Sequence, residues 1–365
     1  MRRSKAKRQQ VVAGQRILNY HNLSKEQVQL TLDQVSELAV KALSASNTSL
    51  LNAESVARSI VAAEADEIHS HGLMRLATYC EHALCGKVDG QAIPRVEKFS
   101  SSAISVDAAC GFAHPAIDEG FKELVPAAKR SGIAALAVRN SYNCGVLGYH
   151  VENLACQGSI GLAFVNAPAA IAPWGGSTPL FGTNPVALAS PRKNGAPLVI
   201  DQSSSVVARG EIMLKAQQGQ PIPDTWGLDK QGKPATDPNA VLKGGSMAPA
   251  GGYKGVNLAL MVEILAAALT GANFSFAASS LADNEGGPPR IGQLFIAIDP
   301  GVFSALAFLD RMEALCAAIL SQEGTRLPGE RRNASRARTA SEGIQIGRKL
   351  FNDLASRVSD LSFHK

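Results

Sequence analysis

Apolar residues near the start of the chain recur at helical spacing. From Thr31 to Thr48 they lie three or four positions apart, which predicts an amphipathic helix. A second helix, rich in alanine and valine, is predicted from about Asn52 to Ala65, and its pattern allows it to continue to Tyr79. The N-terminal part of the chain is therefore expected to be mainly helical.

The pattern changes after the glycine and proline residues that follow position 85. Short apolar runs bounded by turn residues predict strands at residues 133–138, 160–165, 198–200 and 294–298. Helices are predicted at residues 115–129, 255–269, 304–321 and 344–358. This mixture predicts an α+β or mixed α/β fold in which the last two helices return to the N-terminal helical layer. The order of the strands does not follow from the pattern.

The familiar phosphate-binding motifs do not accompany these strands. A GxGxxG between a strand and a helix would mark a Rossmann fold, and GxxxxGK[ST] would mark a P-loop, but neither occurs in such a place. If the protein binds a nucleotide, we expect a different architecture to hold it.

Composition and charge narrow the classes of protein further. With 365 residues and 45% hydrophobic content, the chain is long enough for two domains that share a cleft. Five cationic side chains precede residue 9, and without them the formal charge of +5 falls to zero. The rest of the chain has no basic stripe with interleaved aromatic residues, so nucleic-acid binding is not expected. We interpret residues 1–25 as a disordered basic extension.

Signals for disulfides, metals and membranes are missing from the sequence. The six cysteines form no CxxC pair and no His or Cys residues have metal-ligand spacing, so we expect reduced thiols, no metal site and a cytoplasmic protein. The longest apolar run, residues 256–270, contains Asn257 and Glu263 and is shorter than the roughly 20 residues that cross a bilayer. No membrane association is therefore expected.

Ser70-His71-Gly72, followed by Arg75, combines a proton-transfer pair with a cation. On a continuous helix, His71 and Arg75 would share one face at positions i and i+4. An imidazole would then address a reacting atom while a guanidinium binds a carboxylate nearby. This pattern favours an enzyme that acts on a small acid. The alternative is a pair of solvated surface side chains, which is common by chance.

Glycine-rich turns add candidate ligand contacts. Turns at residues 173–176, 181–185 and 251–255 permit close approach of a ligand to the backbone, and Lys254 precedes a predicted helix whose N-terminus favours an anion. Each turn is equally compatible with a purely conformational need for glycine. Three of them together favour a ligand cleft. We interpret the arginine-rich segment 326–332 as a loop.

Six motifs between positions 70 and 255 carry a family resemblance. They are Ser70-His71-Gly72 with Arg75, Val138-Arg139-Asn140-Ser141, Ala172-Pro173-Trp174-Gly175-Gly176, Gly182-Thr183-Asn184-Pro185, Thr236-Asp237-Pro238 and Gly251-Gly252-Tyr253-Lys254-Gly255. In order and approximate spacing, they resemble the type-2 malate/L-lactate dehydrogenase family. The resemblance implies a nicotinamide-dependent oxidoreductase, a homodimer, and a cofactor domain built on a largely antiparallel sheet instead of a Rossmann fold. It also implies a helical substrate and dimerisation domain at 26–95 and 304–365, with a cofactor-binding domain at 96–303.

The resemblance also bears on the substrate. Asn143, which cannot exchange a proton, stands where many 2-hydroxyacid dehydrogenases of the family have histidine. Glu211 stands where those enzymes often have lysine and where cyclic-imine reductases have aspartate, which is one methylene shorter. These positions favour reduction of Δ1-pyrroline-2-carboxylate or Δ1-piperideine-2-carboxylate to L-proline or L-pipecolate. A 2-hydroxyacid dehydrogenase of the malate, lactate or sulfolactate type stays open because Trp174-Gly175-Gly176 matches that branch, and so does a catalytically silent nucleotide-binding protein.

The resemblance implies a role for each candidate residue. Ser70, His71 and Glu211 form a proton relay, in which a nearby carboxylate raises the pKa of the imidazole toward working pH. Arg75 and Thr183 contact a small carboxylate substrate. NADPH is the expected cofactor, with NADH as the alternative. Its expected contacts are Asn143, Cys144, Gly145, Val146, Leu147, Asp201, Gln202, Ser203, Lys254, Arg326, Pro328, Gly329, Glu330, Arg331 and Arg332.

Overall fold

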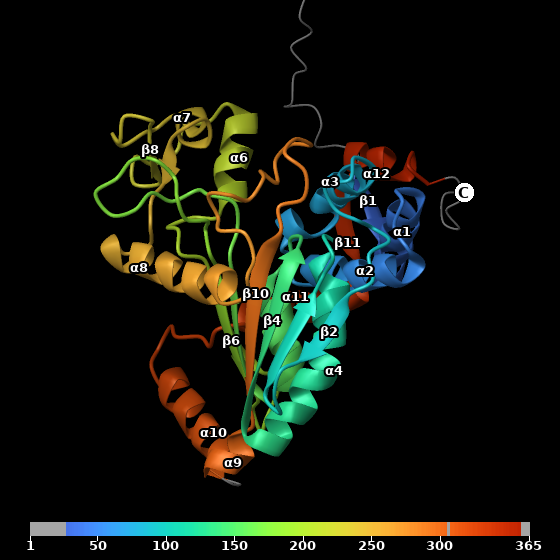
Figure 1. Cartoon of the computed structure of the whole chain (residues 1–365), viewed down its shortest axis with the longest axis vertical. Coiled ribbons are helices and arrows are strands. Elements are labelled where there is room, and N and C mark those ends of the chain that lie inside the picture. Colours follow the sequence, from blue (N-terminus) through green and yellow to red (C-terminus); the bar gives the residue numbers. More distant parts are fainter. Residues whose placement is uncertain (1–26, 305–306, 359–365) are drawn as a thin grey trace, which may run out of the picture.

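A computed structural model describes residues 27–304 and 307–358, so the expected extension at 1–25 lies outside the described residues. A seven-stranded sheet runs through the centre of the molecule (Figure 1). A helical layer built from both ends of the chain lies beyond one end of the sheet, and a smaller group of elements lies beside it (Figure 1).

The central sheet is mostly antiparallel. Its strands run in the order β2 (Arg95–Lys98), β3 (Ala103–Asp107), β4 (Ile133–Ser141), β10 (Ile291–Ile298), β5 (Ile160–Val165), β6 (Val186–Ser190) and β7 (Leu198–Gln202). Of the pairs between these described strands, β3 with β4 is the parallel one. The predicted α+β fold with a largely antiparallel sheet is therefore confirmed, and the four predicted strands correspond to β4, β5, β7 and β10.

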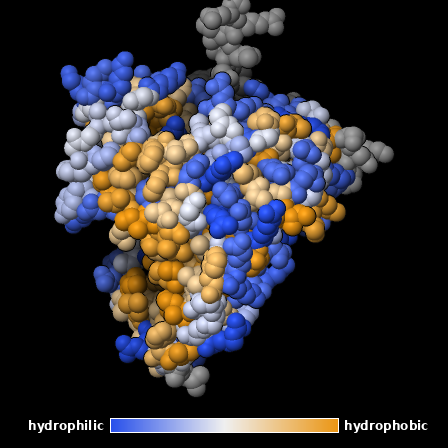
Figure 2. Space-filling model, viewed as in Figure 1, coloured by the Kyte–Doolittle hydropathy of each residue, from blue (hydrophilic) through white to orange (hydrophobic). Residues whose placement is uncertain are grey.

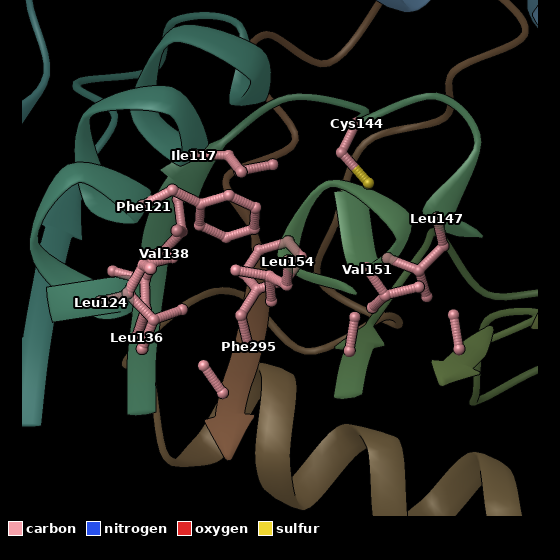
Figure 3. Close-up of a cluster of buried hydrophobic side chains, with 14 of the residues drawn as sticks. Ile117, Phe121, Leu124, Leu136, Val138, Cys144, Leu147, Val151, Leu154 and Phe295 are labelled. Carbon is pink, nitrogen blue, oxygen red and sulfur yellow. The ribbon is translucent and has the colours of Figure 1, made fainter. Parts of the chain in front are cut away.

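Two helices, α4 (Ala113–Ser131) and α5 (Leu147–Cys156), cover one face of this sheet. Figure 3 shows apolar side chains of both helices packed together with those of β4 and β10. At its centre, Phe121 of α4 meets Phe295 of β10 edge to face, with ring centroids 5.2 Å apart. Burial of such side chains stabilises the fold by roughly 1.5–3 kcal/mol each.

The opposite face of β10 contacts α8 (Tyr253–Val262) through its π-helical continuation (Glu263–Ala268). Side chains alternate between the two faces of a strand, so Gly292 points away from Phe295. A Cβ atom at Gly292 would collide with the carbonyl oxygen of Ala266. The missing side chain thus lets the helix approach the strand closely.

A smaller group of elements packs beside α8. It contains α6 (Arg209–Gln218), β8 (Gly227–Leu228), α7 (Pro238–Leu242) and β9 (Ser246–Met247). Helices α6 and α7 and strand β9 share an apolar cluster with Val256 and Ala259 of α8, and β8 pairs with β9.

The helical layer joins segments from the two ends of the chain. It contains α1 (Leu32–Ala45), α2 (Leu50–Ala65), α3 (Leu73–Leu84) and α12 (Arg348–Ala355), beside a two-stranded sheet of β1 (Gln27–Leu30) and β11 (Ile344–Gly347). Thr31 and Gln34 form a reciprocal capping box at the start of α1. This box satisfies two of the backbone N–H groups that the start of a helix leaves open, and the predicted helix within 31–48 is confirmed.

The second predicted helix ends earlier than its pattern allows. Helix α2 stops at Ala65, Glu67 has a positive φ of 58°, and a short 3-10 turn, η2 (His69–His71), follows before α3. The expected continuation to Tyr79 is wrong. Arg75 therefore lies in the first turn of a separate helix, and not at i+4 from the imidazole on a continuous one.

Helix α11 (Glu330–Glu342) holds the end of α2 where this break occurs. Thr339 donates a hydrogen bond to the carbonyl oxygen of Ala65, and Arg336 binds the Asp66 carboxylate. The loop interpretation of 326–332 holds only as far as Gly329, because α11 begins at the next residue. The predicted helix at 344–358 likewise begins as strand β11 before α12 starts.

The C-terminal segment reaches the helical layer later than expected. Helices α9 (Pro300–Ser304) and α10 (Ala307–Leu320) lie at the far end of the sheet (Figure 1). Helix α10 packs through Cys316 against Leu198 of β7, and Glu313 of α10 forms an ion pair with Arg192. The expectation that α10 joins the helical layer is therefore wrong, and the division at 96–303 stays a prediction.

Candidate functional site

A cavity of about 400 Å³ lies where the helical layer meets the central sheet. Its walls come from η2, the first turn of α3, the loop before α5, the end of β7, the start of α6 and residues 280–282. Concave sites of this kind are where small ligands and cofactors bind.

Most residues singled out in the sequence lie on these walls. Ser70, His71, Arg75 and Thr183 all line the cavity. So do the cofactor candidates Asn143, Gly145, Val146, Leu147, Asp201, Gln202, Ser203 and Arg332. The structure thus gathers segments that are as much as 262 positions apart in the chain, from Ser70 to Arg332.

Other candidates lie off the described walls. Lys254, Arg326, Pro328 and Arg331 are exposed at the surface, and Cys144 is buried behind the wall. Gly329, just before α11, and Glu330, its first residue, are partly buried and do not line the cavity. Their contact with a cofactor stays a prediction.

The expected relay partner Glu211 lies in the first turn of α6, directly after Gly210 of the cavity wall. Ser70 Oγ lies 3.1 Å from His71 Nδ1. Among the described residues, no hydrogen bond joins the Glu211 carboxylate to either of these side chains. The carboxylate that acts electrostatically on His71 is Asp201. The structure therefore brings the serine and the histidine together, and leaves Glu211 out of that contact.

Burial sets the protonation state of His71. It lowers the pKa of His71 to about 4, and the positive charge of Arg75 acts in the same direction. The negative charge of Asp201 opposes the shift without cancelling it. The expectation that a carboxylate raises this pKa toward working pH is therefore wrong, because desolvation and cationic neighbours prevail. At neutral pH the side chain is a neutral imidazole.

Asn143 presents an amide donor beside the imidazole. Its Oδ1 accepts hydrogen bonds from the Tyr79 hydroxyl at 2.9 Å and from the Gly145 backbone N–H at 2.7 Å. A backbone N–H is only a donor, so this contact fixes which end of the amide is the oxygen. The Nδ2 group has no protein partner among the described residues and lies on a side chain that lines the cavity.

Two guanidinium groups on the walls lack an anionic partner. Neither Arg75 nor Arg209, the first residue of α6, forms an ion pair with a described residue. Burial lowers the pKa of Arg209, but an arginine stays charged at any working pH. Both side chains are partly buried, and a partly desolvated guanidinium without an anionic partner favours binding of an anion.

A third arginine has chemistry suited to a nucleotide. Arg332 Nη2 donates to Asp201 Oδ2 at 3.2 Å, and its buried Nη1 has no partner in the described part of the chain. Asp201 Oδ2 also accepts from the Gly148 backbone N–H near the start of α5. A Cβ atom at Gly148 would collide with Arg332 Nη1. The residues therefore form a tight cradle that combines a guanidinium, a carboxylate and the start of a helix, which fits the phosphate and hydroxyl groups of a nucleotide.

The Gly182–Pro185 motif is held by a buried polar network. Asn184 has a positive φ of 40° and donates to Ala259 O and to Glu263 Oε1, each at 2.9 Å. Glu263 also accepts from the Ser275 backbone N–H at 3.1 Å. The motif thus places Thr183 on the cavity wall through contacts with α8.

Several wall residues were not singled out from the sequence. They are Arg209, the loop at 167–170 and the segment at 280–282. Arg209 lies two residues before Glu211, so its positive charge could have been noted from the sequence. Its lack of an anionic partner is visible only in the structure. The two loops contribute small or apolar side chains, and no local pattern marks them.

No group of three or more His, Cys, Asp or Glu residues in ranges 27–304 and 307–358 is placed to hold a metal ion. No helix in that part of the chain is long and apolar enough to span a membrane.

Comparison with known proteins assigns the chain to a family. The sequence profile of the family described as malate/L-lactate dehydrogenase matches residues 30–355. The chain belongs to the malate/L-lactate dehydrogenase family. The family resemblance is therefore confirmed, and the protein is a nicotinamide-dependent oxidoreductase.

Relatives of this chain within the family are named for different substrates. The chain is 48% identical over 325 residues to (2R)-3-sulfolactate dehydrogenase (NADP(+)) of Chromohalobacter salexigens, covering 89% of this chain and 96% of that protein. It is 41% identical over 331 residues to Delta(1)-pyrroline-2-carboxylate reductase 1 of Burkholderia ambifaria, covering 90% of this chain and 97% of that protein. A crystal structure of delta1-piperideine-2-carboxylate reductase from Pseudomonas syringae is similar with a TM-score of 0.87 and 37% identity, covering 91% of this chain and 100% of that one. Membership in the malate/L-lactate dehydrogenase family thus leaves the substrate open.

Proposed function

We propose that this enzyme reduces a cyclic imino acid, Δ1-pyrroline-2-carboxylate or Δ1-piperideine-2-carboxylate, with NADPH to give L-proline or L-pipecolate. The observation that carries this proposal is that the cavity wall presents the guanidinium of Arg75 with the His71 imidazole and the non-titrating amide of Asn143, and burial lowers the pKa of His71 to about 4. Reduction of a keto acid needs a proton on the carbonyl oxygen, which a neutral imidazole is poorly able to supply at pH 7. A cyclic iminium brings its own proton on nitrogen.

The residues on the cavity walls suit each part of such a substrate. When bound, the reduced nicotinamide supplies a hydride to the C2 carbon. Arg75 binds the carboxylate in a bidentate manner. His71 accepts a hydrogen bond from the iminium N–H, so that the proton stays on nitrogen while the C=N electron pair moves there. Asn143 donates through its free Nδ2 to the substrate carboxylate or to the nicotinamide amide.

A 2-hydroxyacid dehydrogenase of the sulfolactate type is the second candidate. Arg209 favours it, because a second unpaired guanidinium on the wall suits a substrate with two anionic groups. The identity of 48% to a sulfolactate dehydrogenase supports it as well. A 2-oxo acid with a sulfonate or second carboxylate would then engage both arginines.

NADPH and a homodimer belong to the same proposal. The guanidinium of Arg332 on the cavity wall supports a cofactor with an additional phosphate. Large apolar side chains lie exposed along α8 and the segment after it, among them Met261, Ile264, Leu269 and Phe276. We propose that a second copy of the chain binds to this surface. Light scattering would give twice the monomer mass, and Ile264→Asp would give the monomer mass.

Direct assay tests the function. The purified enzyme is incubated with NADPH and either imine, or with sulfopyruvate, oxaloacetate or pyruvate, between pH 6 and 8. We expect the imines to turn over fastest, and much faster turnover of sulfopyruvate or oxaloacetate would replace the first candidate by the second. His71→Ala should lower kcat by roughly 100-fold, the upper end of the cost of losing a hydrogen bond to a charged group, with NADPH affinity unchanged. Arg75→Ala should mainly raise KM.

A further inference from the structure

We propose that Glu64 is a positioning residue for His71, because one buried carboxylate ties down both ends of the short turn that carries the imidazole. This inference rests on the role of His71 proposed above. Glu64 belongs to the last turn of α2 and does not line the cavity. It acts through the turn, without touching the substrate.

The two carboxylate oxygens bind on either side of His71. Oε2 lies 2.7 Å from the Nδ1 atom of His69, two residues before the imidazole. Oε1 accepts a hydrogen bond from the Leu73 backbone N–H at 2.6 Å, two residues after it. Ser70, His71 and Gly72 therefore lie between two anchored points, and their backbone has little freedom to move independently of α2.

The carboxylate also replaces a missing helix cap. Helix α3 begins after Gly72, which has no side chain to accept a hydrogen bond from the first free backbone N–H groups. Glu64 supplies that acceptor from another helix, and its negative charge lies at the positive end of the α3 dipole. A Cβ atom at Gly72 would collide with this carboxylate. The glycine of the Ser-His-Gly motif thus makes room for Glu64.

The burial of Glu64 indicates that these contacts matter. Only 1% of its surface is exposed, and a buried carboxylate is costly unless it is paired and hydrogen-bonded. The hydrogen bond to Glu64 is the main cause that raises the pKa of the half-exposed His69. The contact with Glu64 therefore favours the protonated form of His69.

The end of α2 that carries Glu64 is itself held in place by helix α11. Arg336 of α11 binds both Asp66, just after α2, and Glu152 of α5. Thr339 of α11 binds the carbonyl oxygen of Ala65 at 3.1 Å. Glu64 therefore links the turn to a helix end that α11 holds in place, so the position of the imidazole is set relative to α5 and the cofactor cradle.

Kinetics of paired variants test the inference. We expect Glu64→Ala to lower kcat by roughly 100-fold, the scale of a misplaced reacting group, with the dissociation constant of NADPH within about twofold of the wild type. Glu64→Gln should recover most of this loss, because its amide oxygen can still accept from Leu73 and its NH2 can donate to neutral His69. His69→Leu removes one anchor and keeps the other, so an intermediate loss is expected.

Matched controls separate positioning from folding. Glu54 is exposed on the same helix, and Glu54→Ala should leave both constants unchanged. If Glu64→Ala keeps kcat within about threefold of the wild type while His71→Ala does not, Glu64 has no positioning role. A parallel loss of kcat and NADPH affinity in Glu64→Ala and His69→Leu would also overturn it. Full turnover by His71→Ala would instead reject the proposed role of His71. Every rate is measured with the acid that the wild type reduces fastest, so the choice of substrate does not decide the result.

Discussion

At the scale of single residues, burial decides how His71 titrates. The pKa of this side chain is lowered to about 4 by burial and by the charge of Arg75. We therefore expect its imidazole NMR signals to titrate near pH 4, well below the ordinary value of about 6.5. Arg75→Gln should raise this pKa, because one of the charges that lower it is removed. A midpoint at or above 6.5 in the wild type would contradict the proposed neutral imidazole.

Arg209 separates the two candidate substrate classes. Its guanidinium lines the cavity without an anionic partner among the described residues. If it binds a second anionic group, Arg209→Gln should raise KM for sulfopyruvate or oxaloacetate roughly 10-fold or more, as expected for loss of a charge-assisted hydrogen bond. KM for a cyclic imine, which has one carboxylate, should change little. Equal effects on both classes would assign Arg209 to the cofactor or to the fold.

At the scale of elements, a buried lysine anchors one wall of the cavity. Residues 280–282 line the cavity, and the segment just after them binds Lys87 of the helical layer. The Lys87 side chain is fully buried, and its ammonium group donates hydrogen bonds to the carbonyl oxygens of Asp283 and Glu285. Leu281 packs against the apolar core of the helical layer. One segment thus connects the two halves of the site.

Removal of that ammonium should loosen the wall. We expect Lys87→Met to raise substrate KM and to make the chain more sensitive to proteolysis near residue 283, because two carbonyl groups lose their donor. The loss of stability should be about 1 kcal/mol, the usual net contribution of a hydrogen bond, because Asp283 and Glu285 are exposed and their carbonyl groups can bind water. Urea unfolding and limited proteolysis measure both effects. Lys129→Met, at an exposed position of α4, is the control, and an identical result for the two variants would remove Lys87 from this role.

At the scale of the whole molecule, buried histidines make the fold sensitive to acid. Burial lowers the pKa of His114 to about 3 and also lowers the pKa of His150. A histidine with a lowered folded-state pKa contributes stability above its unfolded pKa of about 6.5, and this is lost as pH falls toward the folded value. His114 should cost about 1.4 kcal/mol per pH unit in that window, and His150 should act in the same direction.

Thermal unfolding between pH 7 and pH 4.5 measures this sensitivity. We expect Tm to fall steadily below pH 6.5, and His114→Phe should reduce the slope by the share of one group. Neither ring nitrogen of His114 has a hydrogen-bond partner among the described residues, so an apolar ring of similar size is tolerated there. An unchanged slope in this variant would show that other groups cause the acid sensitivity.

The overall surface also has an uneven distribution of apolar groups. Figure 2 shows hydrophobic residues gathered in the middle of this face, over the region of α8, with polar residues around the helical layer and the outer edge of the sheet. Monomeric proteins rarely expose large contiguous apolar patches. This surface is the basis of the proposed dimer contact.

Local sequence alone determined a large part of the fold. Helix α1 and strand β5 (Ile160–Val165) follow from spacing within a few residues, because periodicity and caps act over short range. Helix α11 could not be predicted from spacing, because its polar residues form no apolar face and depend on Asp66 and Glu152 for partners. The break after α2 depends on the same contacts.

The candidate site, too, could be identified from the sequence only in part. Ser70, His71 and Arg75 could be named from the sequence because unusual chemistry lies within six residues of chain. Only the tertiary structure placed Asp201 near the imidazole and left Glu211 out of the relay contact. It also lowered the pKa of His71, since burial and the charges that surround a group depend on segments that meet only after folding. Residue types were thus set by the chain, whereas their protonation and partners were decided by packing.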